Sequence, residues 1–194
     1  YAGGTGTTVG LSERARPLLE AMRAAGMILD TTPLSDESFR EVLELWDGPI
    51  FASHQMCRAL CPGERQFTDE QIRRLIERDG LIAAALDAWM FTPGWIRGQT
   101  MPEGNCNLSM FVDHIDHACQ LAGNARHAAI GTDLDGGYGT EQTPHDLDTI
   151  ADLQKLPDLL RARGYSDDDI RGICHENAVR FLREAWSDSS LYSE

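Results

Sequence analysis

Residues 81–87 read Leu-Ile-Ala-Ala-Ala-Leu-Asp, which is six apolar residues followed by one carboxylate. An unbroken apolar run of this length is typical of a strand that is buried on both faces of a parallel sheet. A helical pattern precedes the run, and Thr68 with Gln71 forms a capping box at its start. This stretch therefore predicts a helix followed by a buried strand that ends at Asp87.

The same helix–strand pattern is found on both sides of this stretch. Three further short apolar runs occupy residues 27–29, 49–52 and 128–131, and each ends at a polar residue: Asp30, His54 and Asp133. Helical patterns surround these runs. We expect N-caps at Ser12 and Ser35, a helix over 108–121, and C-terminal helices over 146–163 and after a cap at Ser166.

Helices that alternate with short buried strands predict an α/β fold made of βα units around a parallel sheet. Four such units are half of a (β/α)8 TIM-barrel-like fold, so we expect this chain to supply about the last four units. We treat residues 1–194 as a single domain, with an irregular lead-in over 1–10 and a frayed tail over 187–194. Because half a barrel has two open sheet edges, we expect it to pair with a second half, as a homo-oligomer would allow, or to be part of a longer protein.

The composition excludes several classes of function. There are 31 acidic and 17 basic residues, so the net charge is −14, which is unsuitable for binding nucleic acid. No apolar run approaches the roughly 20 residues that a membrane-spanning helix needs, so we expect no membrane segment. The five cysteines have scattered spacings that suggest no disulfide framework. We therefore expect reduced thiols and a cytoplasmic location.

Polar residues at the strand ends are the candidates for chemistry, because ligands bind at the carboxyl ends of strands in this architecture. His54 is placed to ligate a transition metal, or to act only as a hydrogen-bonded residue at the rim. Asp133 and Asp135 lie in a glycine-rich segment, where paired carboxylates can handle a proton or hold a metal-bound water. The alternative for this pair is an Asp-Gly turn with a capping role.

Two arginines and two histidines leave further alternatives open. Arg58 and Arg65 follow His54, and either guanidinium could bind a substrate carboxylate or form a structural salt bridge. His114 and His117 lie three residues apart in the middle of a predicted helix. We interpret this pair as helix-face residues, at least one of which is hydrogen-bonded to a neighbouring loop, in preference to metal ligands.

Several motifs resemble the membrane (renal) dipeptidase family of metallopeptidases, which has amidohydrolase-like barrels. The resemblance extends from Gly10 to Trp186. It rests on Gly-Leu-Ser-Glu-Arg-Ala-Arg at 10–16, Gly-Met-Ile-Leu-Asp at 26–30, Ala-Ser-His at 52–54, Arg-Gln-Phe-Thr-Asp-Glu at 65–70, Asp-His-Ile-Asp-His at 113–117, Gly-Thr-Asp-Leu-Asp-Gly at 131–136 and Asn177.

The resemblance implies a zinc metallo-dipeptidase that hydrolyses the peptide bond of dipeptides or of a related small amide. A complete family site holds two Zn²⁺ ions and a metal-bound hydroxide that attacks the peptide carbonyl. By the same resemblance, His54 would be a metal ligand, Arg65 would bind the substrate carboxylate and Asp133 would be the catalytic carboxylate that handles the proton. A small dipeptide-like substrate is then the expected partner.

The chain departs from the family pattern at one expected ligand. The family has Asp-x-Ser-His where residues 30–33 are Asp-Thr-Thr-Pro, so Pro33 replaces a histidine ligand. The ligands that the first half of the family barrel supplies are also not among these 194 residues. The alternatives are therefore a catalytically silent barrel homologue that acts as a binding or scaffold protein, and a non-metal hydrolase or isomerase that uses Asp133 as a base.

Overall fold

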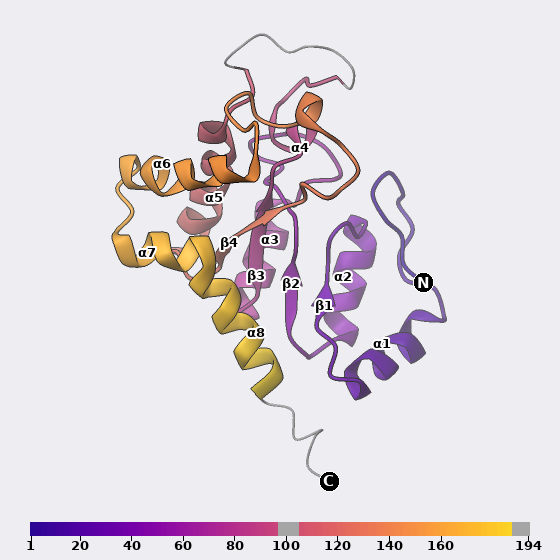
Figure 1. Ribbon diagram of the computed structural model, residues 1–194. Helices are drawn as coiled ribbons and strands as arrows, with labels where there is room; N and C mark the ends of the chain where they lie inside the picture. Colours follow the sequence, from indigo (N-terminus) through magenta and orange to yellow (C-terminus); the bar gives the residue numbers. More distant parts are fainter. Residues whose placement is uncertain (97–104, 188–194) are drawn as a thin grey trace.

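The computed structural model describes residues 1–96 and 105–187. Its centre is a parallel four-stranded sheet with the strand order β1-β2-β3-β4, as Figure 1 shows. The strands are β1 (Leu29–Asp30), β2 (Ile50–Ala52), β3 (Leu81–Ala85) and β4 (Ala128–Thr132). All three pairings are parallel, and a register shift interrupts the β3–β4 pairing between Ala84 and Ala85. The predicted α/β fold with four parallel βα units is confirmed.

Helices connect the strands, and most of the predicted helix starts are confirmed. The Ser35 side chain accepts the Ser38 N–H at the start of α2, and Thr68 and Gln71 form the predicted capping box of α3. The α-helices are α1 (Ala15–Ala24), α2 (Asp36–Leu45), α3 (Asp69–Glu77), α4 (Ala88–Phe91), α5 (Leu108–Ala122), α6 (Leu156–Ala162), α7 (Asp167–Arg171) and α8 (Asn177–Ser187). Two 3₁₀ segments, η1 (Thr140–Gln142) and η2 (Ile150–Lys155), and a π-helical turn, η3 (Gly172–Glu176), complete the elements.

Two helix boundaries differ from the predicted ones. The first helix begins at Ala15 with no side-chain cap, because Ser12 accepts the Ala15 N–H through its backbone carbonyl instead of through its hydroxyl. The predicted helix over 146–163 is divided into η2 and α6. Pro157 lies in the first turn of α6, where a backbone N–H would make no hydrogen bond within the helix, so proline is tolerated there. In the middle of one long helix, proline would remove a hydrogen bond and clash with the preceding turn.

The two faces of the sheet are covered differently. One face packs against α2, α3 and α5 through two clusters of buried side chains, one with Phe39, Ile50 and Leu75 and the other with Phe111 and Ile115. On the other face, Phe181 of α8 packs with Leu81, Ala83 and Ala129. In Figure 1, α3 and α5 lie behind the strands and α8 crosses in front of their lower ends. The upper, carboxyl end of the sheet is therefore free of helix α8.

The loops at this carboxyl end carry the predicted site. The segment after β3 forms the short helix α4, and residues 97–104 of the long connection to α5 lie outside the described residues. The predicted frayed tail also lies outside them from residue 188 onward. Within the described part of the chain, none of the helices has the length and apolar character to cross a membrane.

Candidate functional site

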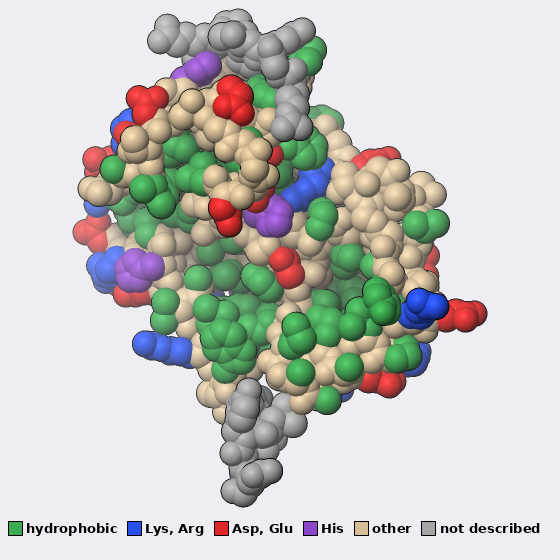
Figure 2. All heavy atoms as spheres, turned by 45° about the vertical axis from the view of Figure 1, so that its right-hand side comes forward, with side chains coloured by type: hydrophobic (Ala, Val, Ile, Leu, Met, Phe, Trp, Pro, Cys, Tyr) green, Lys and Arg blue, Asp and Glu red, His purple; other side chains and the backbone are tan. Residues whose placement is uncertain are grey.

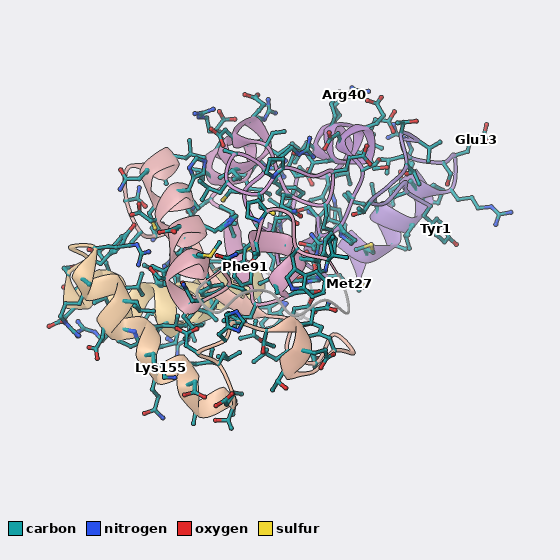
Figure 3. All side chains as sticks on the ribbon, turned by 90° about the horizontal axis from the view of Figure 1, so that it is seen from above. Tyr1, Glu13, Met27, Arg40, Phe91 and Lys155 are labelled. Atoms are coloured by element: carbon teal, nitrogen blue, oxygen red, sulfur yellow. The ribbon has the colours of Figure 1, made fainter. Side chains whose placement is uncertain are left out.

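The charges of three carboxylates at the ends of three strands act on one arginine at the carboxyl edge of the sheet. Arg65 is 7% exposed, and its burial lowers the pKa of its guanidinium, while Asp133, Asp30 and Asp87 act in the opposite direction through their charges. Figure 3 looks down on this end of the molecule, and Phe91 of α4 lies toward its middle. Figure 2 shows a histidine next to acidic and basic side chains above an apolar area of the surface. The sheet thus brings together residues that are up to 103 positions apart (Asp30 to Asp133).

Close backbone approach explains how the segment after β2 reaches β4. The Gln55 N–H donates to the Ala83 carbonyl oxygen at 2.7 Å, so this segment continues alongside β3 beyond the end of β2. Gly131 of β4 lies directly against it, because a Cβ atom added at Gly131 would be 1.9 Å from the Ser53 carbonyl oxygen. Glycine is required at this position since any side chain would collide with backbone.

His54 is held by a hydrogen-bond chain that begins at β1. The Ser53 hydroxyl lies 2.5 Å from Asp30 Oδ2 and 2.8 Å from His54 Nδ1. Asp30 Oδ1 also accepts the backbone N–H groups of Ser53 and Thr32. The half-buried His54 ring is therefore fixed in orientation by Ser53, and Asp30 fixes Ser53.

Arg65 is held by the loop that follows His54. Its Nη1 donates to Gln55 Oε1 at 2.7 Å, and its Nη2 donates to the His54 carbonyl oxygen at 3.0 Å. Gln55 in turn donates through Nε2 to the Arg65 carbonyl oxygen at 2.8 Å. These bonds place the guanidinium beside the strand-end carboxylates, where the prediction put a group that binds a substrate carboxylate.

Arg58 has the structural role among the two arginines. Its guanidinium makes two hydrogen bonds to the carboxylate of Asp36, in the first turn of α2, at 2.9 and 2.7 Å. The same pair lowers the pKa of Asp36, mainly through these hydrogen bonds. The alternative that was left open for Arg58 is thereby settled in favour of a salt bridge at a helix start.

Asp133 directly follows β4 in an unusual backbone conformation. Its φ angle is 63° and that of Thr132 is 25°, both in the left-handed region that non-glycine residues rarely adopt. Asp133 accepts the Gly136 N–H through its backbone carbonyl at 2.9 Å, so a tight turn follows. Conformations of this kind cluster at functional sites, where the surroundings hold them. The Asp-Gly turn that was one interpretation of this segment is present. Asp133 also lies close enough to Arg65 for its charge to act on the guanidinium, which is compatible with the other interpretation, a functional carboxylate.

Asp87 is a member of the site to which the sequence assigned no role. It is 6% exposed, and its two carboxylate oxygens accept Gln142 Nε2 at 2.8 Å and Trp89 Nε1 at 2.7 Å. Burial raises the pKa of Asp87, whereas these hydrogen bonds act against the rise. Burial also raises the pKa of Tyr138, and the charges of Asp87, Asp133 and Asp135 add to the effect. Asp87 could have been predicted as a site residue from its position at the end of a strand. Gln142 and Tyr138 could not, because they follow β4 in a segment without a recognisable sequence motif.

The described residues do not by themselves form a metal site. Within residues 1–96 and 105–187, no three or more His, Cys, Asp or Glu side chains are grouped so that they could hold a metal ion. The position after β1 where the family pattern has histidine is Pro33, which has no ligating atom. His54 is thus one candidate ligand without a complete set around it.

The two histidines of α5 are structural. His114 Nδ1 accepts the Cys57 backbone N–H at 2.9 Å, which confirms the predicted hydrogen bond to a neighbouring loop. His117 Nε2 lies 2.8 Å from Asp69 Oδ1 at the start of α3. The five cysteines are free thiols, as expected.

Comparison with known proteins identifies the class to which this fold and site belong. The model of the membrane dipeptidase family, peptidase family M19, matches residues 2–191. The chain therefore belongs to the membrane dipeptidase family. The resemblance found in the sequence is confirmed.

Individual relatives agree with this assignment. Dipeptidase aclJ of Aspergillus oryzae is 31% identical over 176 residues, which are 89% of this chain and 38% of that protein. The crystal structure of a metallopeptidase from Rhodobacter sphaeroides, liganded with a phosphinate mimic of the dipeptide L-Ala-D-Ala, superposes with a TM-score of 0.81 at 27% identity and covers 96% of this chain. The crystal structure of dipeptidase AC, a metallopeptidase, gives the same TM-score, identity and coverage of this chain.

The chain corresponds to only part of the length of these relatives. The chain covers 50% and 52% of the two solved structures and 38% of aclJ. It spans about half the length of the solved dipeptidases that it matches, in keeping with the predicted last four βα units of the barrel.

Proposed function

We propose that the protein is a metal-dependent hydrolase that cleaves the peptide bond of dipeptides or of a related small amide. The observation that carries the proposal is the group of strand-end side chains around Arg65, in a chain that belongs to a family of dipeptidases. A dipeptide has a fixed carboxylate that a guanidinium can bind, and its hydrolysis requires a proton to be moved at the peptide bond.

Each of the predicted site residues has one task in this proposal. Arg65 binds and orients the substrate carboxylate from its place beside His54 and Gln55. Asp133, which follows β4 nearby, takes up and delivers the proton. His54 is a ligand for a metal ion, and the proposed cofactor is Zn²⁺, with two ions in a complete family site. Since the described residues do not complete such a site, no step of the reaction is assigned to the metal here.

One structural observation favours a second candidate, a catalytically silent homologue that binds a small peptide. Pro33 stands where the family pattern has a histidine ligand, and the described residues hold no complete ligand set. In that case Arg65 would still hold a carboxylate, because its hydrogen bonds do not involve residue 33.

Two measurements on the full-length protein as purified distinguish these candidates. We expect elemental analysis to find stoichiometric zinc, with the intact mass recorded on the same sample, and we expect L-Ala-D-Ala to be hydrolysed. Protein without stoichiometric metal that binds the dipeptide and leaves it intact would support the silent homologue. Hydrolysis that persists after complete removal of metal would contradict both candidates and would favour Asp133 acting as a base without metal.

A further inference from the structure

Ser53 and Asp30 hold His54 in a way that decides which ring nitrogen carries its proton. The three side chains form one chain of hydrogen bonds, with 2.5 Å between Asp30 Oδ2 and Ser53 Oγ and 2.8 Å between Ser53 Oγ and His54 Nδ1. The Asp30 carboxylate also accepts two backbone N–H groups, from Ser53 and Thr32. Three donors therefore converge on Asp30, which acts as an acceptor only.

Only one placement of the protons satisfies both hydrogen bonds of the Ser53 hydroxyl. A serine hydroxyl has a single proton, and an ionised carboxylate can only accept. The Ser53 proton is therefore donated to Asp30, and the Ser53 oxygen must accept the other hydrogen bond. The donor in that bond is His54 Nδ1–H, which leaves the lone pair of the neutral imidazole on Nε2.

The tautomer of His54 matters for function because this side chain lies at the candidate site. The His54 carbonyl oxygen accepts Arg65 Nη2, so the backbone and the ring are both held at the strand-end site. The family pattern has a second histidine after β1, but in this chain that position is Pro33, which has no imidazole. The other histidines whose bonds are described have partners elsewhere: His114 with Cys57, His117 with Asp69, and His127 with the Gly80 carbonyl oxygen. His54 lies at the carboxyl edge of the described sheet, next to Arg65.

We propose that Asp30 and Ser53 are positioning residues that fix His54 as the Nδ1–H tautomer, so that His54 acts on its ligand or substrate through the lone pair of Nε2. Outer-shell carboxylates and hydroxyls orient ligating histidines in this way, and their loss commonly costs 10- to 100-fold in affinity or activity. The functional part of this proposal rests on the proposed hydrolase function. The tautomer itself follows from the hydrogen bonds alone.

The tautomer can be measured without any assay of activity. Full-length protein labelled with ¹⁵N-histidine is examined by long-range ¹H–¹⁵N correlation spectra at about pH 8.5, where an ordinary imidazole is neutral, and His54→Gln assigns the signals. We expect the wild-type His54 to show a protonated Nδ1 and an unprotonated Nε2. In Ser53→Ala, we expect this preference to be lost and Nε2–H to become the major form. Ser53→Thr keeps the hydroxyl and is expected to restore the wild-type spectrum.

Hydrolysis of L-Ala-D-Ala by the same variants tests the functional part. We expect Ser53→Ala to lose 10- to 100-fold in kcat/KM and Ser53→Thr to stay within a few-fold of the wild type. A wild-type His54 protonated on Nε2, or a folded Ser53→Ala protein with an unchanged tautomer, would overturn the positioning role. The expected tautomers in a protein that hydrolyses no dipeptide would instead leave the positioning role standing and reject the proposed function.

Discussion

Asp133 combines a carboxylate side chain with a strained backbone. Its φ angle of 63° and the 25° of the preceding Thr132 place two successive non-glycine residues in the left-handed region. Each such residue costs on the order of 1–3 kcal/mol and persists only where the surrounding contacts hold it. The strain indicates that the surrounding structure holds the backbone at Asp133 in this conformation.

Replacing Asp133 by asparagine tests its task. Asn keeps the shape of the side chain and also tolerates the left-handed conformation, but it cannot take up a proton. We expect kcat for dipeptide hydrolysis to fall about 10²- to 10⁴-fold with KM within a few-fold of the wild type, because general acid–base catalysis contributes that much. Steady-state kinetics on the full-length protein measure this. A kcat within threefold of the wild type would remove Asp133 from the reaction.

Arg65 and Arg58 provide a matched pair of guanidinium groups with different tasks. A charge-assisted hydrogen bond is worth about 1.5–3 kcal/mol. We therefore expect Arg65→Gln to raise KM for L-Ala-D-Ala by about 10- to 150-fold. The C-terminal amide of the same dipeptide lacks the carboxylate, so the substitution should change its KM far less.

Arg58→Gln is the control for this prediction. It breaks the salt bridge with Asp36, which lies at the start of α2 and away from the strand-end carboxylates. KM for both substrates should stay near the wild-type value. If Arg65→Gln affected the free dipeptide and its amide equally, the guanidinium would not be the carboxylate-binding group.

At the scale of elements, Asp87 links two neighbouring strand ends. It lies just after β3, and Gln142 of η1, which donates to it, ends the loop that follows β4. That loop contains Gly136, Gly137 and Gly139, so its backbone is permissive and needs anchors to hold one conformation. The 2.8 Å bond between Asp87 and Gln142 is one such anchor, and Asp133 lies at the other end of the loop.

Variants at both ends of this bond test the anchor. In Asp87→Ala and in Gln142→Ala, we expect faster amide hydrogen exchange over residues 133–142 and a drop in kcat, which is at least as large in Asp87→Ala because that variant also breaks the bond from Trp89. The double variant should be no worse than Asp87→Ala, because Asp87→Ala already breaks the bond that Gln142→Ala removes. Asp87→Asn retains an acceptor oxygen and should keep the slow exchange. Additive losses in the double variant would show that the two side chains act independently.

Helix α5 is tied to the loop after β2 by the buried ring of His114, whose Nδ1 accepts the Cys57 N–H. Burial lowers the pKa of His114 to about 4 from an ordinary value of 6.5. The unfolded chain therefore binds a proton between these two pH values that the folded chain does not, so the free energy of unfolding falls as the pH falls from about 6.5 to about 4. This contribution is fully present above pH 6.5 and amounts to at most about 3 kcal/mol.

His114→Gln should remove this part of the pH dependence. The amide oxygen of Gln can accept the Cys57 N–H, and the side chain does not titrate. Urea unfolding of the wild type and the variant at pH 7.5 and pH 5 measures the difference. We expect the loss of stability between these pH values to be smaller in the variant, and an equal loss in both proteins would exclude His114 as its source.

At the scale of the whole molecule, the described sheet ends in two open edges, β1 and β4. Helix α8 also carries an apolar stripe at helical spacing, with Val179, Leu182 and Trp186 exposed by 41%, 36% and 54%. Open strand edges and contiguous apolar surface promote association. The chain spans about half of the solved dipeptidases, where the same sheet belongs to a longer chain.

We therefore expect residues 1–194, expressed alone, to self-associate at micromolar concentration. Light scattering coupled to size-exclusion chromatography measures the mass against the 21.5 kDa of the chain. Leu182→Glu should shift the protein toward the monomer, since it places a charge in the apolar stripe. Glu176→Gln, at the exposed residue just before α8, is the control and should leave the mass unchanged. A monodisperse monomer of the wild-type chain would contradict the prediction.

The sequence alone determined the order of the elements and where the reactive residues fall along the chain. Continuous apolar runs predict buried parallel strands because both faces are covered, and cap residues such as Ser35 and Thr68 mark helix starts because their side chains accept orphan backbone N–H groups. The polar residue after each run is then placed at the carboxyl edge of the sheet. These are local properties, and the structure confirms them at Asp30, His54, Asp87 and Asp133.

Only the tertiary structure decided which of these residues work together. Nothing in the sequence joins Asp30 to His54 through Ser53, anchors Asp87 to Gln142, or assigns Arg58 to a helix start and Arg65 to the strand-end carboxylates. Those relations depend on close contact between segments that are distant along the chain. The Ser53 backbone can approach β4 closely because residue 131 is glycine, and a pattern of residues along the chain does not record that contact.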